Sequence, residues 1–193
     1  ALGLEELKHR AKTIRLVCFD VDGTLTDGKL YFDAEGRESK AFNVHDGQGL
    51  RLLEDNGIAV AFITARASES AKARARDLRL SHVYIGVKDK AACLRELCEK
   101  LNITPQQAAF MGDDVPDLAA MKLCALACVP ANAHAWMFEH ADWIIPKNSG
   151  EGAARVRPDE RPVRDQRQRD LRHRSEPASQ PHDSVCLQSH RHS

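Results

Sequence analysis

Two acidic residues, Asp20 and Asp22, end an apolar run that is typical of a buried strand. Carboxylates two positions apart normally point to opposite faces of a strand, but Gly23 allows the chain to turn immediately. Both side chains can then face the crevice at the C-terminal end of the strand, where a divalent cation and a phosphate ester would suit them. The structural alternative is that Asp22 and Thr24 cap a turn, and this segment alone does not decide between the two.

Four further residues that could take part in chemistry lie just beyond other predicted strands: Thr64, Arg66, Lys90 and Asp113. Each has an ordinary explanation, because threonine and aspartate often cap helices and a lone surface cation is usually solvated. Together they carry more weight, because the carboxyl ends of parallel strands meet at the ligand-binding edge of a sheet.

The elements that must position these residues alternate between strand-like and helix-like patterns. This alternation predicts an α/β domain with a doubly wound, Rossmann-like parallel sheet that is covered on both faces. The predicted strands are residues 14–19, 58–63, 83–85, 108–111, 123–129 and 143–145. The predicted helices are residues 4–12, 49–55, 68–78, 90–101, 115–122 and 133–140.

One segment interrupts the alternation, at about residues 29–44. Aromatic, strand-forming residues there flank a loop that contains Gly36, which predicts a β-hairpin. Because the hairpin follows directly after the turn at Asp22, it should project over the same crevice.

Composition narrows the class of protein. The 193 residues favour one domain, and a formal net charge of zero gives no electrostatic footprint for nucleic acid. No apolar run approaches the roughly 20 residues that span a membrane, and the first residues lack the order of a signal peptide. The six cysteines show no CxxC spacing, so we expect reduced thiols in a cytoplasmic protein without nucleic-acid or membrane partners.

Read in order, the motifs are DxDGT at 20–24, a threonine, a lysine and GDDxxD at 112–117. Over about residues 12–155 the chain therefore resembles the haloacid-dehalogenase superfamily of phosphotransferases. The resemblance implies that Asp20 is the nucleophile that forms an aspartyl-phosphate, and that Asp22 is the general acid and then the base. An acid at position 22 favours a phosphatase over an ATPase.

The same resemblance implies the remaining roles. Thr64 and Lys90 would hold the phosphate oxygens, and Mg²⁺ would bind Asp20, the backbone carbonyl of Asp22 and Asp113. Two further acids, Asp114 and Asp117, would orient Lys90 and water molecules.

Spacing indicates that no cap domain is inserted. Thr64 lies 44 positions after Asp20, and Lys90 lies 26 positions after Thr64, so these gaps hold little besides the hairpin. Residues 26–31, 40–50 and 63–66 resemble the small capless branch of sugar-acid phosphatases. That branch implies a homotetramer whose hairpin lies near a neighbouring active site. It also implies an acidic eight-carbon sugar phosphate as substrate, and a step in lipopolysaccharide precursor synthesis.

By this resemblance, substrate contacts are expected from residues along the first half of the chain. They are Asp22, Asn43, Val44, His45, Asp46, Gly47, Arg51, Arg66, Arg74 and Lys90. Arginines would suit the substrate carboxylate, which they bind in a bidentate manner, although Arg51 and Arg74 can also be ordinary exposed helix residues. The chain departs from the family at His45, where arginine is usual, and at Ala65, where glycine is usual.

Three other functions compete with this interpretation. A phosphatase for a nine-carbon acylneuraminate phosphate shares the motifs. A sugar phosphomutase would normally need a cap to retain its intermediate. A non-catalytic interaction protein could keep the fold and bind through an arginine-rich tail, but the complete set of acidic and basic motif residues argues against it.

The last segment, residues 156–193, differs from the predicted phosphatase domain at 1–155. It has eight arginines, six acidic residues and no lysine, and its lack of apolar periodicity predicts disorder. The codons of residues 156–163, read one base later, permit Cys-Asp-Leu-Met-Ser-Ala-Gln, which resembles the helix that ends the family's domain. The sequence therefore leads to the hypothesis that a frameshift produced this tail.

Overall fold

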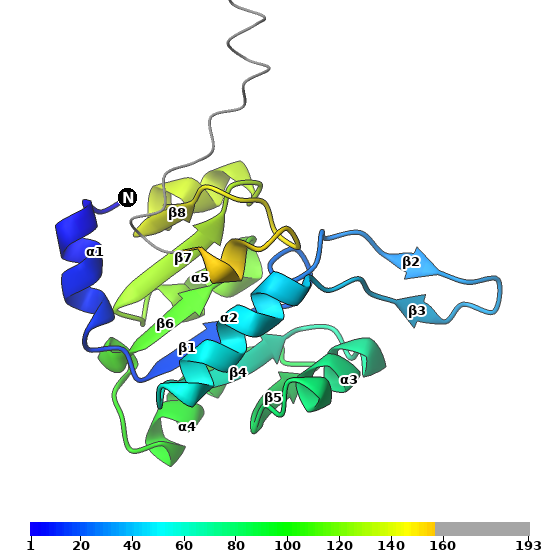
Figure 1. Cartoon of the computed structure of the whole chain (residues 1–193), viewed down its shortest axis with the longest axis horizontal. Coiled ribbons are helices and arrows are strands. Elements are labelled where there is room, and N and C mark those ends of the chain that lie inside the picture. The colour runs from blue at the N-terminus through cyan, green and yellow to red at the C-terminus, as the bar shows by residue number, and fades with distance from the viewer. Residues whose placement is uncertain (157–193) are drawn as a thin grey trace, which may run out of the picture. The chain divides into compact units, whose positions relative to one another are not determined.

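A central sheet of six parallel strands forms the core of the computed structural model, which describes residues 1–156 (Figure 1). The strands are β1 (Leu16–Phe19), β4 (Ala59–Thr64), β5 (His82–Ile85), β6 (Ala108–Met111), β7 (Leu126–Pro130) and β8 (Trp143–Ile145). Their order is β5-β4-β1-β6-β7-β8. The order reverses direction at β1, so the crevice beyond β1 is the place where such a sheet is expected to bind ligands.

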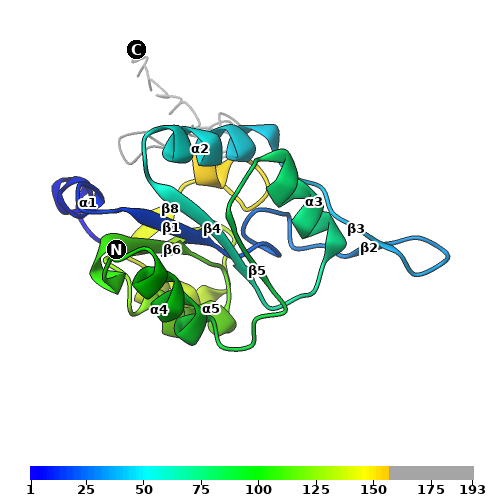
Figure 2. The same ribbon diagram turned by 90° about the horizontal axis from the view of Figure 1, so that it is seen from below.

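Helices cover both faces of the sheet, as Figure 2 shows in side view. The helices α2 (Val44–Asp55) and α3 (Glu69–Asp77) lie on one face, while α4 (Lys90–Lys100) and α5 (Val115–Met121) lie on the other. The helix α1 (Leu4–Ala11) precedes β1, and three 3₁₀ turns complete the described chain at η1 (Pro105–Gln107), η2 (Ala135–His140) and η3 (Ala153–Arg155). The predicted doubly wound α/β fold is confirmed.

Two apolar cores follow from this layering. One packs Phe62 of β4 against Leu50 of α2 and Ala75 of α3. The other packs Phe110 of β6 against Leu94 of α4 and Met121 of α5. Strands that are buried on both faces account for the continuous apolar runs in the sequence.

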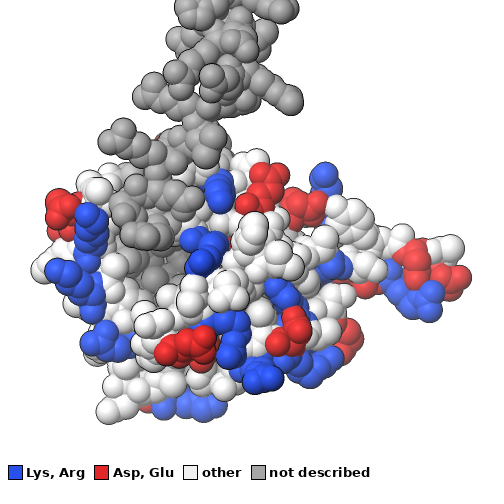
Figure 3. All heavy atoms as spheres, in the orientation of Figure 1, with Lys and Arg blue, Asp and Glu red and all other residues white. Residues whose placement is uncertain are grey.

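A two-stranded antiparallel hairpin, β2 (Tyr31–Phe32) and β3 (Glu38–Ser39), projects from the sheet (Figure 1). Its tip carries Asp33 and Glu35, which pair with Arg37, and charges of both signs are interspersed over the face shown in Figure 3. No cap domain is present among residues 1–156.

Several predicted boundaries are wrong. The second hairpin strand was expected to reach residue 44, but β3 ends at Ser39, and Asn43 already caps α2 through the backbone N–H of His45. The helix α2 therefore begins well before residue 49, where glycines had weakened the apolar pattern. Residues 135–140 form a 3₁₀ helix in place of the α-helix expected over 133–140.

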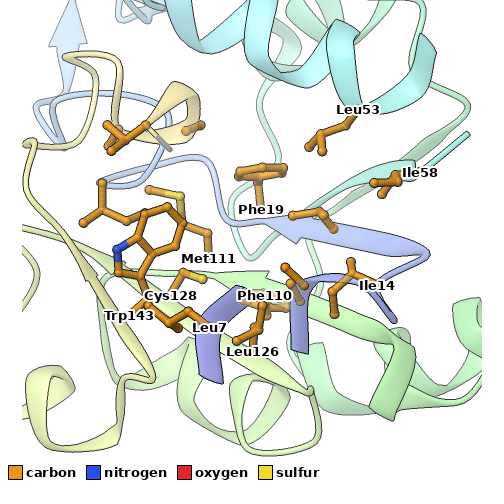
Figure 4. A pocket seen from close by; sticks show the side chains of 17 residues that line it. Leu7, Ile14, Phe19, Leu53, Ile58, Phe110, Met111, Leu126, Cys128 and Trp143 are labelled. Atoms are coloured by element: carbon orange, nitrogen blue, oxygen red, sulfur yellow. The ribbon is translucent and has the colours of Figure 1, made fainter. Parts of the chain in front are cut away.

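An apolar cavity of about 250 Å³ lies against the sheet face between α1 and η3 (Figure 4). Side chains from α1, the strands and α2 line it, among them Leu7, Phe19, Leu53 and Trp143, and Val156 lines it as well. Among residues 1–156, no carboxylate or hydroxyl side chain lines the cavity. Polar side chains that could take part in chemistry lie instead at the carboxyl ends of the strands, at Asp20 and Thr64.

Candidate active site

Asp20 occupies the first position after β1, at the centre of the sheet. Its backbone N–H donates a hydrogen bond to the carbonyl of Met111 at 3.0 Å, which ties the end of β1 to the end of β6. The residue is buried, and its Oδ1 accepts a 2.5 Å hydrogen bond from Lys90 Nζ. The carboxylate is therefore held in a fixed orientation at the crevice.

The turn after Asp20 brings a second acid close. Gly23 has φ of +89°, which favours glycine, and a Cβ at this position would overlap the carboxylate of Asp113. The hydroxyl of Thr24 donates to Asp113 Oδ1 at 3.0 Å. The glycine of the DxDGT motif thus leaves the space that Asp113 fills.

Lys90 lies between two carboxylates at the start of α4, and only 4% of its side chain is exposed. Its Nζ donates to Asp20 Oδ1 and to Asp117 Oδ1, at 2.5 Å in each case. Asp117 Oδ2 also accepts from the backbone N–H groups of Asp113 and Asp114, at 3.0 and 3.3 Å. Asp117 therefore orients both Lys90 and the loop that carries Asp113.

The charges in this cluster do not balance. Oxygen atoms of Asp20, Asp113 and Asp117 lie within 4.8 Å of one another, and Lys90 is the cation in direct contact with two of these acids. Burial, followed by the charge of Asp117, raises the pKa of Asp20 to about 7 and the pKa of Asp113 to about 6. Burial lowers the pKa of Lys90, but the charges of Asp20 and Asp117 outweigh it and the net shift is upward.

This surplus of buried negative charge fits a divalent cation. Carboxylate oxygens are the ligands that Mg²⁺ prefers, and a bound cation would favour the ionised carboxylates that burial and the charge of Asp117 disfavour. Oxygen atoms of Asp20, Asp113 and Asp117 lie close enough together to hold it.

Asp22 and Thr64 complete the rim of the crevice. Thr64 ends β4 and is buried, and its Oγ1 accepts from the backbone N–H of Arg66 at 3.4 Å. Asp22 points toward the hairpin, where its Oδ1 accepts from Lys40 Nζ. Arg66 Nε lies 3.9 Å from Asp22 Oδ2.

The N-terminus of α2 carries five of the predicted substrate contacts, residues 43–47. Asn43 Oδ1 caps the helix, and its Nδ2 donates to the carbonyl of Gly150 at 3.2 Å. Asp46 is buried, and its carboxylate accepts from the backbone N–H groups of Gly152 and Ala154, at 3.3 and 2.8 Å. The carboxylate of Asp46 therefore anchors the end of the described chain.

Val44, His45 and Gly47 occupy the first turn of α2 with them. Val44 is exposed, and Gly47 lies beneath the guanidinium of Arg74, which a Cβ on Gly47 would meet. Among residues 1–156, none of these three residues is hydrogen-bonded to Asp20, Lys90, Asp113 or Asp117.

Two predicted contacts, Arg51 and Arg74, face a separate cavity of about 510 Å³ between α2 and α3. Arg51 Nη1 donates to the carbonyl of Leu78 at 3.0 Å. Arg74 donates to the carbonyl of Asn43 at 3.2 Å and lies over the ring of Phe42. The structure does not bring these arginines together with Asp20.

Asp114 lies at the N-cap of α5, where its Oδ1 accepts from the N–H of Val115 at 2.7 Å. It makes no contact with Lys90 within the described chain, whereas Asp117 does.

Sequence reasoning missed Lys40 and Glu38. Lys40 contacts Asp22, and Glu38 contacts Arg66, from the base of the hairpin. In the sequence, Lys40 and Glu38 resemble the ordinary charged residues that flank a strand. The one available signal was their position beside Phe42 in a segment predicted to project over the crevice.

Comparisons with known proteins agree with this arrangement. Residues 83–156 match the profile of the haloacid dehalogenase-like hydrolases. The chain is 39% identical over 150 residues to the 3-deoxy-D-manno-octulosonate 8-phosphate phosphatase of Escherichia coli strain B, an alignment that covers 78% of this chain and 80% of that protein.

Solved structures of similar proteins also match this chain in fold and sequence. A protein of Xanthomonas campestris described as hypothetical is 56% identical, with a TM-score of 0.76 over 78% of this chain and 82% of its own. The 3-deoxy-D-manno-octulosonate 8-phosphate phosphatase of Moraxella catarrhalis was solved with a magnesium ion, a phosphate ion and the sugar acid KDO. It is 39% identical, with a TM-score of 0.77 over 79% of this chain and 88% of its own.

Proposed function

The chain belongs to the haloacid dehalogenase-like hydrolases and, within them, to the 3-deoxy-D-manno-octulosonate 8-phosphate phosphatases, and we propose that it catalyses the reaction that names that family. Its substrate would be 3-deoxy-D-manno-octulosonate 8-phosphate, and its products the free sugar acid and phosphate, in lipopolysaccharide precursor synthesis. The observation that carries the proposal is the buried contact of Lys90 with Asp20 and Asp117, beside Asp113.

In the proposed mechanism the carboxylate of Asp20 attacks the phosphorus atom, and the bond from phosphorus to the sugar oxygen breaks. Asp22 gives its proton to that oxygen. Asp22 then takes a proton from water, whose oxygen attacks the phosphorus of the aspartyl-phosphate and releases Asp20 and phosphate. Lys90 and Thr64 hold the non-bridging phosphate oxygens.

A magnesium ion, when bound by Asp20, Asp113 and the carbonyl of Asp22, would supply the positive charge that offsets the approach of an anionic ester to anionic side chains. The buried cluster of acids supports this assignment, because burial and then the charge of Asp117 raise the pKa of Asp20 and Asp113, and a bound cation would favour their ionised forms.

Selectivity for a sugar acid needs more than these residues. Arg66 lies at the crevice beside Asp22 and can bind a carboxylate. We also propose a homotetramer in the cytoplasm, in which each hairpin lies near a neighbouring active site. The exposed side chains of Leu30, Tyr31 and Phe32 on the hairpin support it, because a projecting apolar patch is typical of an interface.

Arg51 and Arg74 would then contact substrate only if a neighbouring subunit brings them to its site.

No helix among the described residues is long and apolar enough to cross a membrane.

Phosphate release from the eight-carbon and a nine-carbon sugar-acid phosphate, with Mg²⁺ or EDTA, tests the function. We expect metal-dependent turnover that favours the eight-carbon ester. Asp20→Asn should abolish turnover without lowering the melting temperature, which separates loss of chemistry from loss of fold. A preference for the nine-carbon ester would favour an acylneuraminate phosphatase, and no turnover of either by the wild type would refute a sugar-acid phosphatase.

We further propose that the domain ends near residue 155 and that a shifted reading frame encodes residues 156–193. Two observations support this: the family match ends at residue 156, and Val156 lines the apolar cavity, which an amphipathic helix that follows it could cover. The tail itself, with its predicted disorder, lies outside the described residues. Comparison of the coding DNA tests the proposal, and the absence of an amphipathic segment in the shifted frame would rule it out.

A further inference from the structure

A buried lysine lies next to the acid that the proposed mechanism uses twice. Lys40 follows β3 at the base of the hairpin, and only 1% of its side chain is exposed. Its Nζ donates to Asp22 Oδ1, and it also pairs with Glu38 Oε1 at 2.8 Å. A lysine is almost never fully buried unless it is paired, so these two contacts account for its burial.

Glu38 is held on its other side. Its carboxylate accepts from Ser68 Oγ at 3.1 Å and pairs with Arg66 Nη2. Hydrogen bonds from Lys40 and Arg66 lower the pKa of Glu38 to about 2, so Glu38 is ionised at any working pH. Glu38 therefore gives Lys40 a fixed anionic partner, and the ammonium cannot follow Asp22 if that side chain rotates.

The two carboxylate oxygens of Asp22 differ in their hydrogen bonding. Oδ1 accepts from Lys40, whereas Oδ2 is buried and has no hydrogen-bond partner among residues 1–156, since the Nε of Arg66 lies 3.9 Å away, beyond hydrogen-bond distance. An unpartnered buried oxygen is costly unless the site uses it. It is also the oxygen that is free to exchange a proton with the leaving group.

We propose that Lys40, held by Glu38, is a positioning residue that fixes the rotamer of Asp22 so that Oδ2 faces the leaving-group oxygen. The inference rests on the proposed phosphatase function and assigns the base of the hairpin a role in proton transfer. Lys40 touches neither the phosphate nor the sugar in this scheme and acts only through Asp22.

A series of substituted aryl phosphates tests the proposal, because general-acid help matters more as the leaving group becomes more basic. For each ester, kcat/KM is measured with Mg²⁺ and plotted against leaving-group pKa. We expect Lys40→Met to lose about tenfold or more with phenyl phosphate and less than about threefold with p-nitrophenyl phosphate, so that the slope steepens. The esters have similar size, so a loosened hairpin would lower all points alike.

Two comparisons complete the design. The matched control is Lys29→Met, in the same hairpin but with a side chain 74% exposed, and its slope should equal that of the wild type. Asp22→Asn should steepen the slope fully, and adding Lys40→Met to it should change the slope no further, because a positioning residue has nothing left to position.

Glu38→Gln keeps the charge of Lys40 but weakens its anchor, and it should give an intermediate slope even if Lys40→Met does not fold. Parallel lines for wild type, Lys40→Met and Glu38→Gln would overturn the positioning role and leave the phosphatase function standing. No hydrolysis of any ester by the wild type would instead refute the phosphatase function, and this inference with it.

Discussion

Removal of the positive charge from Lys90 should destabilise the metal-free protein strongly. Lys90 Nζ contacts two carboxylate oxygens at 2.5 Å, and all three side chains are at least nine-tenths buried. At an effective dielectric constant of about 20, each contact has a gross attraction of about 7 kcal/mol. Desolvation of the three ions offsets most of it, and breaking one side of such a buried set typically costs about 3–5 kcal/mol.

We therefore expect Lys90→Met to lower the free energy of unfolding by about 3–5 kcal/mol in EDTA. For a domain of this size that corresponds to a fall in melting temperature of about 6–20 °C. Saturating Mg²⁺ should restore more stability to the variant than it adds to the wild type, because the variant has one more uncompensated negative charge for the ion to offset.

The assay is urea unfolding with EDTA and with Mg²⁺, followed by circular dichroism. Lys72→Met is the matched control, since the side chain of Lys72 is 41% exposed and pairs with Glu69 on the surface of α3, and it should change stability by less than about 0.5 kcal/mol. A Lys90→Met variant as stable as the wild type in EDTA would refute the reasoning that uncompensated charge is buried in this crevice.

Three further changes probe other parts of the structure. Gly23→Ala would place a Cβ against the carboxylate of Asp113 at a positive φ, so we expect a stability loss of about 1–3 kcal/mol and weaker Mg²⁺ binding by calorimetry. Asp46→Ala would remove the acceptor of two backbone N–H groups near residue 153; a loss of about 2 kcal/mol or more and faster proteolysis there are expected, and Asp46→Asn should lose less. The pKa of Glu38 lies near 2, below its unfolded value of about 4.3, so its stabilisation is complete above that value and falls as pH drops toward 2. The stability difference between wild type and Glu38→Gln should therefore shrink between pH 5 and pH 3, and a constant difference would contradict the ionic role.

The sequence was sufficient to predict the meeting of Asp20 and Lys90, which stand 70 positions apart. The prediction depended on a general rule, that parallel strands present their carboxyl ends at one edge, and each residue followed a recognisable strand. The layering and the hairpin were predictable for the same reason, because periodicity in apolar residues reports directly on burial.

The contacts of Lys40 and Asp46 could not be predicted in this way. Lys40 reaches Asp22 from the base of the hairpin, and no spacing rule encodes that contact. Asp46 anchors a loop more than 100 positions later through backbone N–H groups, which any residue can supply. The α-helix expected at 133–140 failed because apolar spacing alone does not distinguish a 3₁₀ turn from a short α-helix.

The anchor at Asp46 also bears on the order in which the chain folds during synthesis. Its carboxylate bonds to backbone groups 106 and 108 positions further along, so the start of α2 cannot reach its final state until residue 154 has been made. The hydrogen bond from Asn43 Nδ2 to the carbonyl of Gly150 likewise cannot form until Gly150 has been made. The sheet centre can form earlier, but the start of α2 is completed only when nearly the whole domain has emerged from the ribosome.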